Sequence, residues 1–239
     1  MVTQAVFLDL DATLLDFDMA AWTEALRAVC ARLALPAGVD RDRLGEVYAE
    51  ASTRHFLAAE ETHAAPADGH AIWRELWRDA LAACGCDDDA LAEQAVTSYE
   101  IERAARYRLY ADVLPTVAEL RRRVSALVLI TNGPGTTQRH KVAATGLADL
   151  LDAVIISGEV GVSKPDAGVF EIAARAAGVP LAAAWHVGDS LANDVAGAAN
   201  ARLGAGVWLN RTGAARPADA PRPDHEIGSL HELAALLDA

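Results

Sequence analysis

The sequence predicts an α/β protein with a doubly wound, Rossmann-like parallel sheet as its core and an inserted all-helical cap domain. The chain begins with a short apolar run typical of a buried strand, whereas residues from about 16 to 108 show only helical periodicity. After residue 108, strand-like runs alternate with helical segments, which indicates right-handed βαβ units and a parallel sheet covered on both faces. We therefore expect a core domain of residues 1–15 and 109–239 and a cap domain of residues 16–108.

The first predicted strand, 5–8, leads directly into the predicted cap. Capping acids, a helical rhythm of apolar residues and helix breakers divide the cap into four expected helices. Because the cap leaves the core after the first strand, we expect it to lie over the carboxyl end of that strand. The expected helices begin near Asp16 or Asp18, Asp40, Ile72 and Asp89, and they end near Pro36, the break at 64–69, Gly85 and Tyr107.

The rest of the chain alternates between strands and helices. Apolar, β-branched runs predict strands at 126–132, 153–157, 184–188 and 206–209. Pro165 and Gly178 bracket one of the intervening helices, because proline suits the first helical position and glycine the residue just past the end. The other expected helices run from Pro115 to Arg123, from the turn at 133–135 to Thr145, from Asn193 to Asn200 and from Leu230 to Leu237.

The composition is that of an ordinary globular protein with a strongly acidic balance. The 239 residues carry a formal net charge of −13, from 21 basic and 34 acidic side chains. This charge argues against nucleic acid or an anionic membrane as a partner. No apolar run approaches the roughly 18 residues needed to span a bilayer. The three cysteines lack the spacing of a zinc site and favour reduced thiols, so we expect a cytoplasmic protein. We expect the protein to be a monomer or a homodimer.

Each predicted strand is followed by polar residues that meet at one edge of the predicted sheet. Two acids follow the first strand, although isolated buried carboxylates are costly unless a site needs them. In an open α/β sheet, ligands bind outside the carboxyl ends of the strands. We therefore expect a single site at this edge, built from Asp9, Asp11, Thr131, Lys164, Asp189 and Asp194.

These carboxylates, with one hydroxyl and one lysine, suit phosphate chemistry. Oxygen ligands favour Mg²⁺ over zinc, which prefers nitrogen and sulfur. A phosphate about 4 Å from a carboxylate is repelled by roughly 4 kcal/mol at an effective dielectric near 20, and Mg²⁺ with Lys164 would offset that repulsion. A carboxylate that attacks phosphorus forms an aspartyl-phosphate, while a second carboxyl serves first as acid and then as base. Neighbouring carboxylates would raise the pKa of this second carboxyl and keep it protonated for the first step.

The same residues form, in order, the motifs of a known family. Asp9-Leu10-Asp11-Ala12-Thr13 resembles the family's Asp-x-Asp-x-Thr/Val motif on the first strand. Thr131 ends the second strand, Lys164 precedes a helix, and Gly188-Asp189 with Asp194 follows the fourth strand. On these motifs, which span essentially the whole predicted core, the chain resembles the haloacid dehalogenase superfamily. The resemblance implies Asp9 as the nucleophile and Asp11 as the general acid and base.

The resemblance also implies a metal site. Mg²⁺ would be held by Asp9, by the backbone carbonyl of Asp11 and by Asp189. Asp194 would lie behind these ligands or bind the metal through water. A simpler interpretation of Asp194 is that it caps the helix it begins.

Contacts to the transferring phosphoryl group are implied in the same way. Thr131 and Lys164 would bind this group, together with the backbone N–H of Asn132. Ala12 departs from the family pattern, in which glycine is commoner, but the position varies and the alanine is not expected to disable the site.

Further stretches narrow the resemblance. Thr131-Asn132-Gly133 with Gln138 and Lys141, and the segments 158–165 and 207–210, look most like phosphatases that act on N-acylneuraminate 9-phosphate, and they are also similar to nucleoside 5′-monophosphate phosphatases. We therefore predict a Mg²⁺-dependent phosphatase that hydrolyses a small soluble phosphomonoester, a phosphosugar or a nucleotide, through an aspartyl-phosphate. Its expected partner is thus a small phosphorylated metabolite.

Three alternative functions stay open. A phosphomutase shares both aspartates but retains the phosphoryl group. A 2-haloacid dehalogenase is disfavoured, because Asp11 and a metal site would have no role in it. A non-catalytic binding protein with this fold predicts at least one broken catalytic position, and the sequence contains none.

Several other polar and aromatic residues have simpler interpretations. His186, within a predicted strand, is expected to pack in the core, and Trp73 and Trp77 are expected to pack inside the cap. The predicted cap also contains histidines that lack a metal-binding spacing and of which one could face the substrate, namely His55, His63 and His70.

Overall fold

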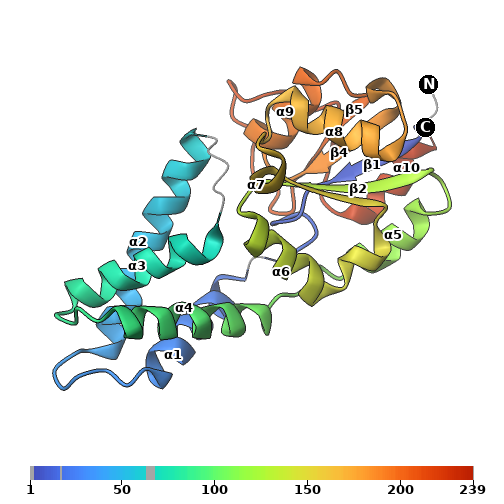
Figure 1. The fold of residues 1–239 in the computed structure, drawn as a ribbon. Coiled ribbons are helices and arrows are strands. Elements are labelled where there is room, and N and C mark those ends of the chain that lie inside the picture. The colour runs from blue at the N-terminus through green and yellow to red at the C-terminus, as the bar shows by residue number, and fades with distance from the viewer. Residues whose placement is uncertain (1–2, 17, 63–67, 239) are drawn as a thin grey trace.

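The computed structural model describes residues 3–16, 18–62 and 68–238. Within these ranges the strands form one six-stranded, fully parallel sheet with the order β3-β2-β1-β4-β5-β6. Helices cover both faces of this sheet (Figure 1), so the predicted doubly wound α/β fold is confirmed. The strands are β1 (Ala5–Leu8), β2 (Ala126–Thr131), β3 (Ala153–Ile156), β4 (Ala184–Gly188), β5 (Ala205–Leu209) and β6 (His225–Ile227).

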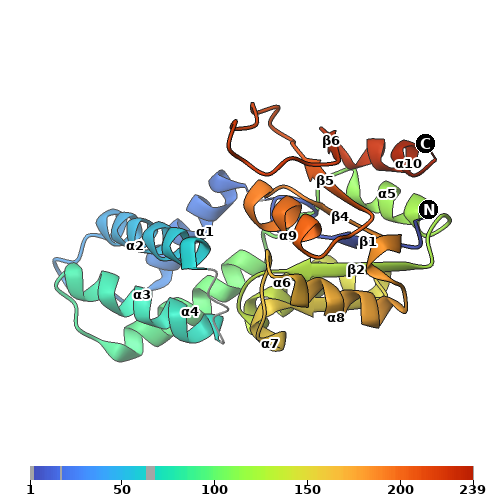
Figure 2. The ribbon, with the colours of Figure 1, turned by 90° about the horizontal axis from the view of Figure 1, so that it is seen from above.

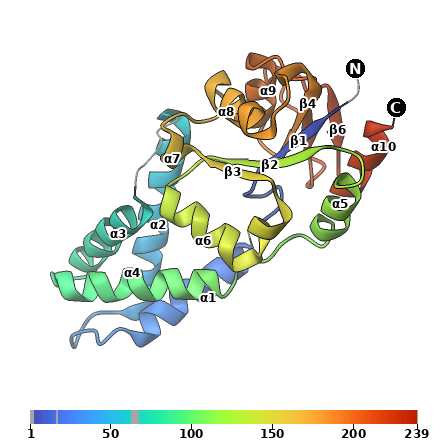
Figure 3. The same cartoon turned by 45° about the vertical axis from the view of Figure 1, so that its right-hand side comes forward.

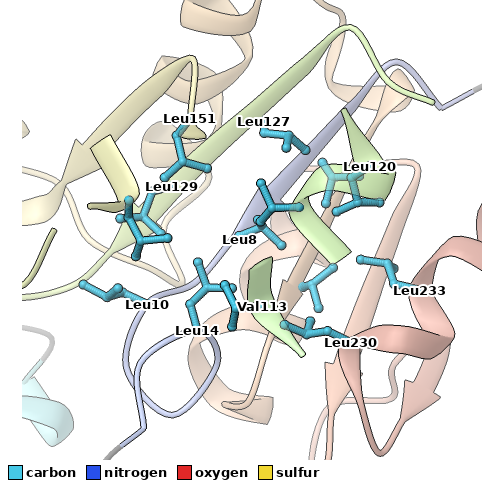
Figure 4. Close-up of a cluster of buried hydrophobic side chains, with 14 of the residues drawn as sticks. Leu8, Leu10, Leu14, Val113, Leu120, Leu127, Leu129, Leu151, Leu230 and Leu233 are labelled. Atoms are coloured by element: carbon cyan, nitrogen blue, oxygen red, sulfur yellow. The ribbon is translucent and has the colours of Figure 1, made fainter. Parts of the chain in front are cut away.

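Strand β1 lies inside the sheet and is buried on both faces. Successive side chains of a strand point to opposite faces, and Val6 and Leu8 accordingly join one hydrophobic cluster while Phe7 joins another. Figure 4 shows the first cluster, which packs Leu8 against leucines of the neighbouring strand and of the covering helices. The helices on this face are α5 (Val113–Leu120), α6 (Gly135–Thr145) and α10 (Leu233–Leu237), and those on the other are α8 (Ala167–Ala177) and α9 (Ala196–Asn200).

Helices α1 to α4 pack around a hydrophobic core of their own. Trp73 and Trp77 are buried in it, as expected, and the rings of Tyr48 and Trp77 stack with centroids 4.0 Å apart. These helices lie together beyond one end of the sheet (Figures 1 and 2), and α3 and α4 contact α6. The residue ranges of the two domains stay predictions. The helices are α1 (Met19–Arg32), α2 (Arg41–Thr62), α3 (Gly69–Ala83) and α4 (Asp89–Ala104).

Side-chain caps decide where two of the helices begin. Asp18, rather than Asp16, caps α1 by accepting a hydrogen bond from a backbone N–H of its first turn. The prediction that Pro165 occupies the first helical position is wrong, because Asp166 caps α8, which begins two residues after the proline. Gly178 ends α8 in the left-handed conformation, as expected, with φ of 69°.

The short elements were not predicted. Strand β6 has three residues and a single buried side chain, Ile227, so it is too short to show an alternating pattern. Helix α7 and the short turns η1 and η2 leave no periodic signal either. The unpredicted helical elements are α7 (Ser157–Val160), η1 (Leu147–Leu150) and η2 (Leu181–Ala183). Two other short elements begin predicted helices: η3 (Leu191–Val195) starts the helix predicted from Asn193, and η4 (Leu230–Glu232) starts the last helix.

In the described ranges, no helix has both the length and the apolar character needed to cross a bilayer.

Asp112 joins segments from three parts of the core. Its carboxylate accepts hydrogen bonds from both terminal nitrogens of Arg211 at 2.9 Å, from Ser229 Oγ at 2.8 Å and from the backbone N–H of Leu230 at 2.9 Å. Burial raises the pKa of Asp112, but hydrogen bonds from Arg211, Leu230 and Ser229 outweigh burial and hold the pKa below its ordinary value.

Replacing Asp112 with asparagine should lower the free energy of unfolding by about 2–3 kcal/mol at neutral pH, because Arg211 loses its charged partner. Since the folded-state pKa is depressed, the stabilisation is present above the ordinary pKa of 3.8 and is lost as pH falls through the folded-state value. Urea unfolding should therefore show a difference between the two proteins that shrinks below pH 4. Asp219→Asn, in an exposed loop, is the matched control, and equal stabilities at neutral pH would contradict this prediction.

Candidate active site

The polar residues that follow the strands gather at the carboxyl edge of the sheet. Strand β1 pairs in register with both β2 and β4, so Asp9, one residue past β1, lies level with the ends of its neighbours. The backbone N–H of Asp9 donates to the carbonyl of Val187 on β4 at 3.0 Å. Thr131 is the last residue of β2, and Asp189 directly follows β4. The parallel sheet therefore places groups from distant parts of the chain at one edge.

Lys164 lies buried between two buried carboxylates. Its Nζ atom donates to Asp9 Oδ1 at 2.6 Å and to Asp194 Oδ1 at 2.6 Å. The loop that carries Lys164 is held by the side chain of Asn132, which donates to the Lys164 carbonyl and accepts from the Lys164 N–H, each at 2.9 Å. Asn132 thus positions the lysine, a contact not foreseen from the sequence, while the proposed role of its own backbone N–H stays a prediction.

Asp194 is bound on several sides. Besides the lysine, its carboxylate accepts from the backbone N–H of Ser190 at 2.9 Å and bonds to His186 Nε2 at 2.8 Å. The interpretation that Asp194 caps its helix is wrong, because Ser190 is the N-cap of η3 and Asp194 lies inside that turn. Gly188 permits this arrangement, since a Cβ atom there would lie 2.1 Å from the Asp194 carboxyl carbon.

His186 is buried in the core, as expected, yet it also contacts the site. Its Nε2 donates to the Asp194 carboxylate, because an ionised carboxylate can only accept. Burial lowers the pKa of His186, against the opposing effect of this hydrogen bond. The imidazole therefore supports Asp194 as a neutral donor, a role that the sequence pattern did not suggest.

The turn after β1 explains the departure at Ala12. Ala12 has a φ of 58°, in the left-handed region that favours glycine, and its N–H donates to the carbonyl of Leu15 at 2.9 Å. Thr13 continues this turn, and its hydroxyl accepts from the backbone N–H of Asp189 at 3.1 Å. Alanine therefore retains the turn, at a conformational cost of about 1 kcal/mol.

Asp9, Asp189 and Asp194 form a group with the chemistry of a magnesium site. One carboxylate oxygen from each lies within 4.8 Å of the others. Burial raises the pKa of Asp9 to about 8. The charge of Lys164 opposes this rise, and repulsion from Asp194 and Asp189 adds to it. Burial and Asp194 raise the pKa of Asp189 to about 6. This crowding of negative charge around hard oxygen donors is what a divalent cation relieves, so the residues fit Mg²⁺.

The side chain of Asp11 has partners outside this acidic group. Both of its carboxylate oxygens accept from Lys141 Nζ at 2.7 Å, and Oδ2 also accepts from Gln138 Nε2 at 2.9 Å. The Gln138 amide nitrogen further donates to Thr131 Oγ1 at 2.5 Å. The role of the Asp11 backbone carbonyl as a metal ligand stays a prediction.

The predicted pKa of Asp11 is wrong in direction. Burial raises it, but the charge of Lys141 and hydrogen bonds from Lys141 and Gln138 outweigh burial and lower the pKa below its ordinary value. Gln138 and Lys141 were noted only for their similarity to relatives and were given no role. Their i, i+3 spacing on the helix after β2 was the available signal, because it places both side chains on one face, toward the first motif.

A pocket opens beside Asp11, between the turn after β1 and helices α1 and α4. Trp22 of α1, Arg103 of α4 and Tyr107, which lies just after the end of α4, line it. Figure 3 shows α6, which carries Gln138 and Lys141, between the sheet and α4. The described cap histidines, His55 and His70, are not among the lining residues, and His63 lies outside the described part of the chain.

The chain is similar to known hydrolases over most of its length. A family model described as haloacid dehalogenase-like hydrolase matches residues 3–202. An N-acylneuraminate-9-phosphatase from Rattus norvegicus is 34% identical over 165 residues, which cover 68% of this chain and 66% of that protein. A phosphoserine phosphatase from Thermus thermophilus is 40% identical over 159 residues, 66% of this chain and 62% of that protein. The matches thus span just under two thirds of these relatives. The crystal structure of a 2-haloacid dehalogenase from Pseudomonas syringae has a TM-score of 0.72 at 29% identity, covering 99% of each chain.

Proposed function

Because the chain belongs to the haloacid dehalogenase-like hydrolases, we propose that it is a Mg²⁺-dependent phosphatase that acts on a small phosphomonoester through an aspartyl-phosphate. The observation that carries this proposal is the pair of carboxylates after β1, which have separate surroundings. Asp9 lies against Lys164 and the acidic group, whereas Asp11 is bound by Lys141 and Gln138. Two carboxyl groups with such different partners suit two different chemical roles, and Mg²⁺ beside Asp9 would favour the ionised form that a nucleophile requires.

Asp9 is the nucleophile in this proposal. One of its oxygens attacks phosphorus, the bond from phosphorus to the leaving oxygen breaks, and the phosphoryl group is left on Asp9. Lys164, already in contact with Asp9, supplies positive charge next to the transferring group, and Thr131 supplies a hydroxyl. Mg²⁺, held by Asp9, Asp189 and the Asp11 carbonyl, would offset the negative charge of the phosphate and the carboxylates.

Asp11 moves the protons. It donates a proton to the leaving oxygen, and it then removes one from the water that hydrolyses the aspartyl-phosphate. Its lowered pKa suits the second step, in which it acts as a base. For the first step it must be protonated, and an anionic phosphoryl group arriving beside it would raise its pKa toward that state.

The similarity to a dehalogenase favours one alternative. Displacement of a halide needs a carboxylate nucleophile, but it needs no acid for the leaving group and no metal. Such an enzyme would have no use for the acidic group around Asp9 or for the paired Asp11. A phosphomutase would use both aspartates, but it would not release inorganic phosphate. A cytoplasmic location and a monomeric or dimeric state stay predictions.

The proposal is tested by measuring phosphate release from p-nitrophenyl phosphate and from a panel of phosphosugars, nucleotides and phosphorylated small acids, with Mg²⁺ or with excess chelator. We expect release that needs Mg²⁺ and no bisphosphate activator. Activity on a 2-haloacid that survives the chelator, without phosphate release from any monoester, would overturn the proposal in favour of a dehalogenase. A requirement for a bisphosphate activator would favour the mutase.

A further inference from the structure

Arg103 of α4 is a cation held in place by aromatic rings. Its guanidinium carbon lies 5.1 Å from the centre of the Trp73 ring, 5.4 Å from that of Tyr99 and 5.6 Å from that of Tyr107. Such contacts fix the direction of a long side chain without neutralising its charge. The guanidinium is therefore ordered before any ligand arrives, which lowers the entropic cost of binding one.

No acidic side chain in the described ranges forms an ion pair with Arg103. The neighbouring Arg106, by contrast, is paired with Glu102. Asp11 lies in the same pocket, but both of its oxygens are already bound by Lys141. Arg103 acts on Asp11 electrostatically and helps to lower its pKa, but none of the described carboxylates forms an ion pair with its guanidinium, which can therefore pair with a ligand.

The place of Arg103 identifies what it would contact. In the proposed reaction Asp11 protonates the leaving oxygen, so groups that share a pocket with Asp11 face the leaving group rather than the phosphoryl group. Asp16 and Asp18 also line this pocket, and they disfavour a ligand that carries a second doubly charged phosphate there. A planar, singly charged carboxylate matches the two-pronged guanidinium at a lower electrostatic cost.

We propose that Arg103 binds a carboxylate on the leaving-group side of the substrate, so that the preferred substrates are phosphomonoesters of hydroxy acids. This inference rests on the proposed phosphatase activity. It makes Arg103 a specificity-determining residue, contributed by a helix that packs against the core domain rather than by a strand end.

The test compares substrates that differ at the carboxylate. O-phosphoserine is paired with phosphoethanolamine, and 3-phosphoglycerate with glycerol 3-phosphate. In the wild-type protein, kcat/KM should favour the carboxylate member of at least one pair by about tenfold or more, and Arg103→Met should bring that ratio close to one. The kcat/KM ratio of Arg103→Lys should lie between those of the wild type and Arg103→Met, because lysine keeps the charge but lacks the planar guanidinium. Arg27→Met, on the exposed side of α1, should keep the wild-type ratio.

The outcomes separate this inference from the proposed function. If the wild-type protein hydrolyses no phosphomonoester, the phosphatase proposal fails. If it hydrolyses monoesters but shows no carboxylate preference, or a preference that Arg103→Met leaves unchanged, only the role of Arg103 fails. A bisphosphate preferred over both acids would also overturn it. Should the variants misfold, inhibition of wild-type p-nitrophenyl phosphate hydrolysis by glycerate but not by glycerol supports the inference, and equal inhibition contradicts it.

Discussion

Replacing Asp9 with asparagine should abolish phosphate release, with kcat reduced by at least about 10⁴-fold. The amide has nearly the same shape but lacks the charged oxygen that attacks phosphorus. Lys164 keeps its bond to Asp194, so the loss should come from chemistry and not from collapse of the site. The measurement is phosphate release at saturating Mg²⁺, with Asp219→Asn as the matched control on the surface.

Two further measurements separate a chemical defect from a folding defect. Since the folded protein raises the pKa of Asp9 to about 8, a neutral side chain is favoured there, and the variant should be at least as stable as the wild type at neutral pH without metal. Wild-type protein quenched in acid during turnover should gain the mass of one phosphoryl group, and the variant should not. Unchanged turnover, or a phosphorylated variant, would contradict the assignment of Asp9.

Replacing Asp11 with asparagine should lower kcat by about 10²–10⁴-fold, the usual loss when a positioned acid and base is removed. The loss should be greater for alkyl phosphates than for p-nitrophenyl phosphate, because nitrophenolate leaves without needing a proton. The measurement is the ratio of kcat between variant and wild type for the two kinds of leaving group. An equal loss for both would mean that Asp11 does not protonate the leaving oxygen.

The partner of Asp11 supplies a control for this variant. Asp11→Asn leaves the buried Lys141 without its carboxylate, which should cost about 1–3 kcal/mol of stability. The double variant Asp11→Asn with Lys141→Met removes both partners, and its stability should recover while its activity does not. Recovery of activity in the double variant would show that Asp11 acts only through its ion pair.

Much of the site could be predicted because its residues follow strands. An apolar run that ends in a polar residue is a local pattern, and a parallel sheet brings all such ends to one edge, as it does for Asp9, Thr131 and Asp189. The groups that were missed belong to other elements. Gln138 and Lys141 lie on a helix face, Arg103 lies in the helical cap region, and His186 lies inside a strand. None of these positions looks unusual until the partner across the fold is known.

The sequence by itself determined the class of fold, the order of its longer helices and strands, and the edge of the sheet at which the acids meet, because apolar periodicity, capping residues and turn residues act locally. Only the tertiary structure decided which charges pair. Lys164 lies 155 residues from Asp9, and Lys141 lies 130 from Asp11. A pKa depends on burial and on charges within a few ångströms, which separation along the chain does not reveal. The fold therefore decided that the pKa of Asp9 rises while that of Asp11 falls, and with it the chemical difference between the two aspartates.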